Sequence, residues 1–293
     1  MTQPTTPLIV DVGMHDGSDS EFYLQKGFDV VAIEANPALV ERVTSRLRDP
    51  VEEGRLTILP VAVADQEGHI DFYLSDQDLW ASTTPEMADR GIHGVQRRKI
   101  AVPCAPLDKL LAGYPTPYYI KIDVEGHDPD CIDAIGRMPQ KPRYLSFEAD
   151  LTDVDETVGI LTTLETYGYA GFKLVNQATH GTRRLPDPPL EGRFVDVRFS
   201  KHHSGPFGAE TPGEWVSRDE VERQYRRVLK QQAARIEYSG TGRIFGIPMS
   251  RVHRPLMWLY NVPWVTRARL RWASWRGVES GGWFDVHARL EGK

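Results

Sequence analysis

The chain has 293 residues, 40% of them hydrophobic and 26% charged, with a formal net charge of −6. This length allows one α/β domain with an addition, or two modest domains, and the core is large enough to need no metal or disulfide support. The sequence has no stretch near the roughly 18 apolar residues of a membrane span, no signal-peptide pattern and only two cysteines, Cys104 and Cys131, so we expect a cytoplasmic protein in which both cysteines are buried and unpaired.

Apolar strands and helices alternate along the first third of the chain. "LIVDVG" is a β-branched strand that ends in glycine, and "DSEFYLQKG" predicts a short helix that ends at Gly27. "DVVAIEA" predicts the next strand. A helix follows, with Asn36 as its cap and Pro37 at its first position. "LTILPVAVA" and "HIDFYLS" predict two more strands, joined by the turn "DQEG".

The same alternation continues to about residue 200. "YYIKIDV" and "RYLSFEA" predict buried strands, each followed by a helix, in "CIDAIGRM" and over about 153–167. "GFKLVN" and "VDVRFSK" predict two closing strands. Strands that alternate with helices are typical of a doubly wound, mostly parallel α/β sheet.

The chain changes character near residue 205. From there on, 15 Lys and Arg stand against 9 Asp and Glu, a net of +6, which leaves −12 on residues 1–204. Six of the seven tryptophans also lie beyond this point. We therefore divide the chain into a catalytic domain, 1–204, and a basic, tryptophan-rich C-terminal extension, 205–293, that is partly helical. Within the extension, residues 220–238 predict an exposed helix with charges on several faces.

Four acids lie within or at the end of the predicted parallel strands, Asp11 within the first and the other three at strand ends. These residues are Asp11, Glu34, Asp123 and Glu148. Ligands of such sheets collect at the carboxyl ends of the strands, so we expect the four carboxylates to lie on one rim.

The loop after the first strand favours a cationic ligand. Asp11, Gly13 and Gly17 follow a D-x-G-x-x-x-G spacing, in which the glycines allow a sharp turn and close approach of a ligand. The dinucleotide pattern G-x-G-x-x-G is absent. Asp16, next to His15, would repel a phosphate at the helix start. S-adenosylmethionine, with its sulfonium and amino groups, fits this loop better.

Glu34 stands where a carboxylate accepts hydrogen bonds from both ribose hydroxyls of a nucleoside cofactor. An exposed acid at a helix start is the alternative interpretation. Ala35 follows it, and residues 62–65, which begin with Ala62, are candidates to flank an adenine.

"YYIKIDVEGHDPD" places charge at the end of a buried strand. Alternation puts Lys121, Asp123 and Glu125 on one face. A buried lysine needs a partner, so we expect Lys121 to pair with Asp123, Glu125 or Glu148. Asp128, followed by proline, predicts a helix N-cap.

These motifs together resemble the FkbM family of S-adenosylmethionine-dependent methyltransferases. The resemblance rests on "DVGMHDG", "VVAIEANP", "AVADQEG", "YYIKIDVEGHD" and "YLSFEAD" in this order, and covers residues 8 to about 199. His15 departs from the family pattern, which often has a small polar residue there. The resemblance implies a class I, Rossmann-like methyltransferase fold that acts on a hydroxyl. It also implies cofactor contacts by Asp11, Gly13, His15, Gly17, Glu34, Ala35, Ala62 and Asp123.

Methyl transfer to an alcohol needs the hydroxyl proton to be removed. The candidates for this role are His127, Glu125, Asp123 and Glu148. Histidine has the best-matched ordinary pKa, whereas a carboxylate beside Lys121 has its pKa lowered and is a weaker base. Alternatively, Asp123 and Glu148 bind Mg²⁺, which polarises the acceptor oxygen. We do not favour this metal, because Lys121 competes for the same charges.

"PWVTRARLRWASWRG" gathers tryptophans on one arc of a helix, with arginines beside it. The segment either lies on an anionic membrane as a peripheral contact or packs on the catalytic domain or a second subunit, and we favour packing. Nucleic acid is not expected, because the patch is short and the chain acidic.

The sequence thus predicts an S-adenosylmethionine-dependent O-methyltransferase. Its expected acceptor is a small molecule or glycan: a sugar, a glycan or glycolipid precursor, or a secondary metabolite. The loops near 76–98 and 177–193 would select it. An NAD-dependent oxidoreductase and a non-catalytic binding protein on the same fold are the alternatives.

Overall fold

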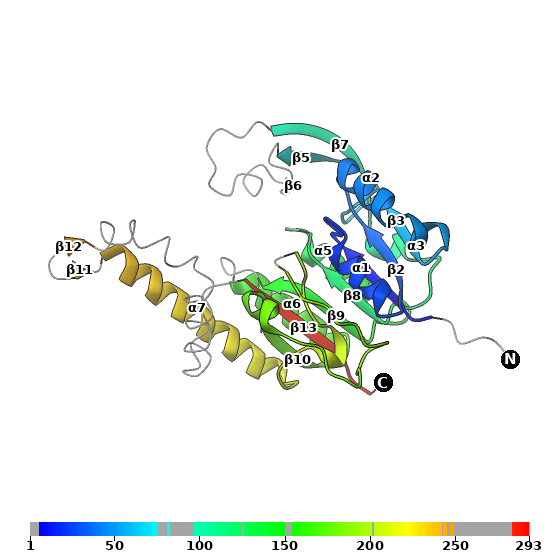
Figure 1. The fold of residues 1–293 in the computed structure, drawn as a ribbon. Coiled ribbons are helices and arrows are strands. Elements are labelled where there is room, and N and C mark those ends of the chain that lie inside the picture. The colour runs from blue at the N-terminus through cyan, green and yellow to red at the C-terminus, as the bar shows by residue number, and fades with distance from the viewer. Residues whose placement is uncertain are drawn as a thin grey trace.

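The computed structural model describes residues 6–75, 81–82, 97–124, 126–149, 154–200, 202–241, 243–244, 247–248 and 283–292. Figure 1 shows a central sheet with helices on both faces and a smaller sheet at one end. The predicted Glu125, and the tryptophan-rich segment over 263–276, lie outside the described residues.

The central sheet has seven strands in the order β10-β13-β9-β8-β1-β2-β3. β13 is antiparallel to both of its neighbours, and the other pairs are parallel. The strands are β1 (Leu8–Val12), β2 (Asp29–Ile33), β3 (Leu56–Leu59), β8 (Tyr119–Ile122), β9 (Tyr144–Ala149), β10 (Tyr169–Asn176) and β13 (Phe284–Leu290).

The middle strands form because their side chains are apolar on both faces. All five residues of β1 and all four of β8 are buried, as expected for parallel strands covered on both sides. Because β1 and β8 are paired in register, Asp11 lies beside Lys121. The carboxyl ends of β1, β2 and β8 therefore meet at one rim, which confirms the predicted doubly wound sheet.

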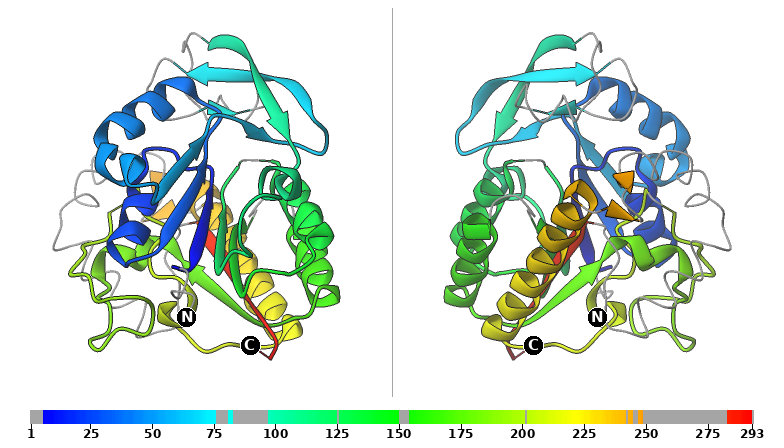
Figure 2. Two further views of the ribbon diagram at one scale, coloured as in Figure 1. Left: turned by 90° about the vertical axis from the view of Figure 1, so that its right-hand side faces the viewer. Right: turned by 90° about the vertical axis from the view of Figure 1, so that its left-hand side faces the viewer.

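Helices cover the two faces separately (Figure 2). One face carries α1 (Ser18–Gln25), α2 (Pro37–Arg46) and α3 (Arg48–Glu52), and the other carries α4 (Leu107–Leu110), α5 (Asp128–Arg137), α6 (Val154–Thr166) and α7 (Arg218–Thr241). Asn36 caps α2 by accepting a hydrogen bond from the Ala38 N–H, with Pro37 at the helix start, as predicted.

A second sheet of four strands lies beyond β3. Its order is β4-β7-β5-β6, with β4 (Ala62–Val63), β5 (Gly68–Ser75), β6 (Ala81–Ser82) and β7 (Arg97–Ala105). The prediction of one strand over "LTILPVAVA" is wrong, because the chain leaves the first sheet at Pro60 and joins the second. Proline lacks the N–H that a continuous strand would need. A short hairpin, β11 (Arg243–Ile244) and β12 (Ile247–Pro248), completes the strands.

One of the two predicted closing strands is wrong. "VDVRFSK" was predicted as a strand, but residues 195–200 are not a strand, and β13 lies between β9 and β10 instead. Residues 177–283 therefore form an insertion between two hydrogen-bonded neighbours, β10 and β13. The insertion includes two short 3-10 helices, η2 (Gln177–Thr182) and η3 (Gly208–Glu210).

The region set apart as 205–293 shares the sheet of the first region through β13. Whether it folds separately stays a prediction. Its long helix α7 packs against α6 and β10 (Figure 1). The prediction of an exposed helix is wrong for the first turns, because Val221 and Tyr225 are fully buried in the core.

Candidate active site

The glycine loop between β1 and α1 fits closely against the end of β8. The Gly13 N–H donates to the Ile33 carbonyl at the end of β2 (3.0 Å), and Gly13 has φ +82°. A Cβ at this position would lie 1.9 Å from the carbonyl oxygen of Asp123. Only glycine fits there, so the loop packs directly against the ends of β2 and β8.

Glu34 connects this loop to the start of α2. Its Oε2 accepts a hydrogen bond from the His15 N–H and its Oε1 one from the Asn36 N–H, both at 2.8 Å. Burial raises the pKa of Glu34 to about 7, although both backbone bonds act in the opposite direction. Glu34 is only 8% exposed, so it is a buried acid at the rim and not an exposed surface acid.

The predicted adenine side is apolar. Ala62 is buried in a cluster with Ala64, Phe72 and Val102, and Ala35 packs against this cluster. The structure therefore brings Ala35 and Ala62 together next to Glu34.

Lys121 lies within ion-pair distance of three carboxylates at the rim. Its Nζ lies 3.3 Å from Asp123, 3.4 Å from Asp19 and 3.5 Å from Asp11. The expected pairing with Asp123 is confirmed, and the other two partners were missed. Burial lowers the pKa of Lys121, but the three negative charges outweigh it and raise that pKa well above its usual value. Asp11 is fully buried and accepts a hydrogen bond from the Ser20 hydroxyl (2.6 Å), so it supports the loop from below.

His127 lies directly before α5, at the same rim. Its Nδ1 is 2.7 Å from Asp130 Oδ2, and its side chain is 26% exposed. When the His127 Nδ1–H donates a hydrogen bond to the Asp130 carboxylate, this bond orients the imidazole, and Nε2 is the nitrogen that can accept a proton. Asp130 was not among the predicted site residues, although its spacing, three residues after the histidine at the start of a predicted helix, indicates a contact between the two side chains.

The N-cap of α5 differs from the prediction. His127 occupies the cap position and Asp128 is the first helical residue. The Asp128 Oδ1 accepts a hydrogen bond from the Val124 N–H (3.3 Å), so it joins the helix to the end of β8. Burial, together with the negative charge of Asp123, raises the pKa of Asp128 to about 8.

This buried acid predicts a pH-dependent stability. The pKa of Asp128 in the folded chain is higher than the ordinary pKa of an aspartate, which is about 4, so the folded state binds the proton more tightly than the unfolded state. The stabilisation is therefore complete below about pH 4 and is lost as the pH rises to about 8. We expect Asp128→Asn to be more stable than the wild type at pH 9 and to lose this advantage toward pH 4. Thermal unfolding across this pH range measures the difference. Asp133→Asn, on an exposed position of α5, is the control, and an equal pH dependence in both variants would contradict the assignment.

β13 brings one more acid to the rim. Asp285 lies opposite Glu148 in the antiparallel pairing of β13 with β9. Its carboxylate accepts a hydrogen bond from the Gln177 side-chain amide. Burial and the charges of Asp123 and Glu148 raise the pKa of Asp285 well above its usual value. Asp285 belongs to the sequence "GGWFDVHA", but no local sequence pattern predicts that this segment lies beside Glu148.

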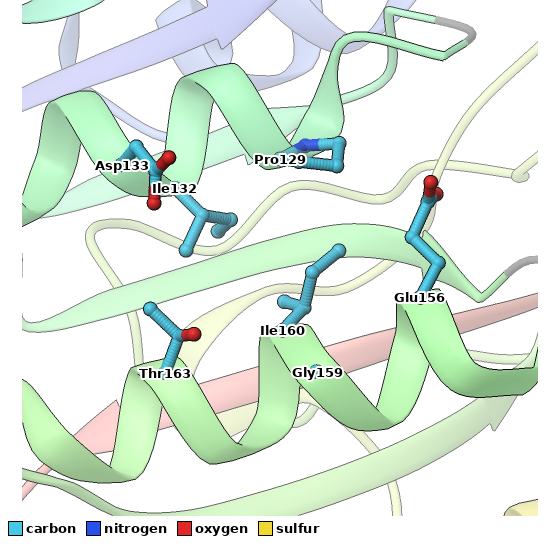
Figure 3. Close-up of a pocket in the computed structure, with 7 residues that line it drawn as sticks. All are labelled: Pro129, Ile132, Asp133, Glu156, Gly159, Ile160 and Thr163. Carbon is cyan, nitrogen blue, oxygen red and sulfur yellow. The ribbon is translucent and has the colours of Figure 1, made fainter.

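A separate hollow of about 180 Å³ lies between α5 and α6 (Figure 3). It is lined by Pro129, Ile132, Asp133, Glu156, Gly159, Ile160 and Thr163. None of the predicted site residues lines it, so it is distinct from the rim.

Within the described ranges, no helix is long and apolar enough to cross a membrane. Both cysteines are buried and unpaired, as predicted. The candidate pair for Mg²⁺, Asp123 and Glu148, is part of no group of three metal-ligating side chains among the residues that the structure describes.

Comparison with known proteins gives one family. The model of the methyltransferase FkbM domain matches residues 11–170, which is more than half of the chain. None of the curated proteins compared with the chain matches it.

Solved structures of methyltransferases are similar at low identity. The FkbM methyltransferase of Methylobacillus flagellatus KT is 19% identical with a TM-score of 0.39, and the match covers 58% of this chain and 40% of that chain. The precorrin-6y C5,15-methyltransferase of Geobacter metallireducens GS-15 is 18% identical with a TM-score of 0.35, over 58% and 67% of the two chains. Phosphoethanolamine N-methyltransferase 2 of Haemonchus contortus, in complex with S-adenosyl-L-methionine, is 9% identical with a TM-score of 0.34, over 98% and 49%. With the loop, the acidic rim and the strand order described above, the match over residues 11–170 places this chain in the FkbM methyltransferase domain family.

Proposed function

We propose that the chain is an S-adenosylmethionine-dependent O-methyltransferase. Its acceptor would be a hydroxyl on a small molecule or glycan, namely a sugar, a glycan or glycolipid precursor, or a secondary metabolite. The observation that carries the proposal is Glu34, a buried carboxylate at the end of β2 that is joined to the glycine loop through the His15 N–H.

The residues of the rim fit the cofactor. Gly13 lets the loop pack tightly against the end of β8, Glu34 offers carboxylate oxygens to ribose hydroxyls, and Ala35 and Ala62 form an apolar edge for adenine. Asp123, whose side chain is 46% exposed, adds negative charge near a sulfonium. When bound, the cofactor supplies a methyl group on a positively charged sulfur, open to displacement by an oxygen.

His127 is the base that the geometry supports best. Its contact with Asp130 holds the ring in one orientation, as carboxylate–histidine pairs do in general acid–base sites. Asp123 is less suited to remove a proton, because its carboxylate is already paired with the Lys121 ammonium group at 3.3 Å. Glu148 is half-buried beside Asp285, and Glu125 stays a prediction outside the described residues.

Lys121 also bears on the Mg²⁺ alternative. A divalent ion shared by Asp123 and Glu148 would stand close to the buried ammonium group of Lys121, and the two cations would repel each other. Methyl transfer that is unchanged after exhaustive chelation would agree with the metal-independent route.

Replacing Glu34 with glutamine is expected to weaken cofactor binding by about 10- to 100-fold. Hydrogen bonds to a charged group contribute about 1.5–3 kcal/mol, and the amide has only one accepting oxygen for the ribose hydroxyls and backbone N–H groups together. Calorimetric titration with S-adenosylmethionine measures the change. The control is Glu41→Gln on the exposed face of α2. An affinity equal in both variants would remove Glu34 from the cofactor site.

The reaction itself is tested with a methyl-labelled cofactor. The full chain is incubated with fractionated small molecules and glycans, and the labelled product is identified by mass spectrometry. A methyl ether supports the proposal, whereas a labelled amine or carbon contradicts the O-specificity. If the cofactor does not bind at all, a non-catalytic protein on the same fold is the better interpretation.

A further inference from the structure

A group of metal-ligating side chains lies beside the glycine loop, apart from the Asp123–Glu148 pair. His15 and Asp16 come from the loop between β1 and α1, and His202 comes from the insertion. One ligand atom of each residue lies within 4.8 Å of the other two. The His202 Nδ1 is 3.5 Å from Asp16 Oδ2, and the His15 Nδ1 is 4.0 Å from Asp16 Oδ1.

The backbone of the loop holds the first two side chains in place. His15 has φ +52°, a left-handed conformation that costs a non-glycine residue about 1–3 kcal/mol. Its N–H donates to Glu34, and this bond helps to hold the strained residue. The Asp16 Oδ1 accepts a hydrogen bond from the Ser18 N–H (3.0 Å), and the Asp16 carbonyl accepts one from Arg46 Nη2 (2.6 Å).

His202 is held over the loop by its own neighbours. Its N–H donates to the Ser200 hydroxyl (3.2 Å), and the Ser204 N–H donates to the buried Asp19 in α1 (2.9 Å). The imidazole rings of His15 and His202 are stacked, 6.3 Å apart and inclined by 12°. Two segments far apart in the sequence thus bring these three ligand atoms within 4.8 Å of one another.

The three groups match the chemistry of a zinc-class ion. Two imidazole nitrogens and a carboxylate oxygen are a common ligand set for such ions, which bind these atoms at about 2.0–2.2 Å. Ligand atoms around a tetrahedral ion are then about 3.3–3.6 Å apart. The two histidine nitrogens lie 3.5 and 4.0 Å from different oxygens of Asp16, and one ligand atom of each residue lies within 4.8 Å of the other two, so binding an ion requires the side chains to draw together by up to about 1.5 Å. The side chains are 36%, 24% and 31% exposed, so an ion can enter and water can be a fourth ligand.

We propose that His15, Asp16 and His202 bind one divalent transition-metal ion of the zinc class. The ion joins the insertion to the loop between β1 and α1. One of its ligand residues, His15, also donates its backbone N–H to the Glu34 carboxylate. Its role is to fix the position of these segments. The proposal does not depend on which acceptor the rim takes.

The test uses the full chain without a polyhistidine tag, treated with a chelator and then titrated with Co²⁺ alone. We expect one Co²⁺ per chain with the visible absorption of a low-coordinate site, displacement by Zn²⁺, and a rise in melting temperature on binding. His202→Ala and Asp16→Asn are each expected to lower the affinity at least about tenfold, and to remove most of the melting shift. Asn keeps an acceptor for the Ser18 N–H and removes the charge.

The matched control is His69→Ala, which removes an exposed histidine of β5. It is expected to bind the metal as the wild type does. A cooperative thermal unfolding transition in the presence of chelator shows that a variant is folded. If His202→Ala is not folded, Asp16→Asn alone decides the result. Absence of one-to-one binding at micromolar Co²⁺, or equal binding by all variants, overturns the proposal. In that case the Asp16–His202 contact is an ion pair only.

Discussion

Substituting Lys26 with methionine is expected to lower the free energy of unfolding by about 3–5 kcal/mol. The Lys26 Nζ lies 2.8 and 2.9 Å from the two carboxylate oxygens of Glu210, and neither side chain is exposed. Methionine fills a similar volume but leaves a buried negative charge without its partner. Because Lys26 is the C-cap residue of α1 and Glu210 is the last residue of η3, the loss weakens the contact between the core and the insertion.

Chemical denaturation of the purified variants measures this change. A second substitution, Glu210→Gln on the Lys26→Met background, removes the unpaired charge and is expected to restore part of the stability. Arg48→Met breaks an exposed pair with Glu52, whose side chains are 72% and 71% exposed, and is expected to change the stability by less than about 1 kcal/mol. Equal effects of Lys26→Met and Arg48→Met would contradict the importance of burial.

Gly13→Ala is expected to abolish measurable cofactor binding and to destabilise the fold. The new Cβ would lie 1.9 Å from the Asp123 carbonyl oxygen and 2.9 Å from its carbon, and these backbone atoms cannot move without shifting the end of β8. The loop must then leave its place at the rim. Calorimetric titration with S-adenosylmethionine and thermal unfolding measure the two effects.

A second glycine separates the collision from the backbone strain. Gly54 also has a positive φ, +71°, but a Cβ there would meet nothing within 4 Å. Gly54→Ala is expected to cost only about 1–2 kcal/mol and to leave cofactor binding unchanged. If Gly13→Ala binds the cofactor as well as Gly54→Ala does, the close packing of the loop is not essential to the site.

The sequence predicted the elements whose signals are local. β1, β2, β8 and β9 are apolar runs, and α2 begins with its own cap and proline. It did not predict β13, because this strand belongs to the sheet only through pairing with β9 and β10, and no local pattern states that pairing. "VDVRFSK" has the composition of a strand, yet residues 195–200 are not a strand, and β13 lies between β9 and β10.

The same distinction applies to the site. Gly13, Glu34 and Asp123 were found because each follows a predicted parallel strand, and such strand ends meet at one rim. Asp19 and Asp285 were missed because their place near Lys121 and Glu148 depends on how a helix and a distant strand pack. The burial that raises the pKa of Glu34 also results from packing, so the sequence alone could not predict it.

The position of β13 affects the order in which the chain can fold as it is synthesised. β10 leaves the ribosome well before residues 284–290, yet β13 is its only partner strand among the described residues. Until β13 emerges, β10 and one side of β9 have backbone groups without their strand partner, a surface that other strands can join. A nascent chain stalled within the insertion should therefore bind chaperones and aggregate more readily than one stalled after residue 290.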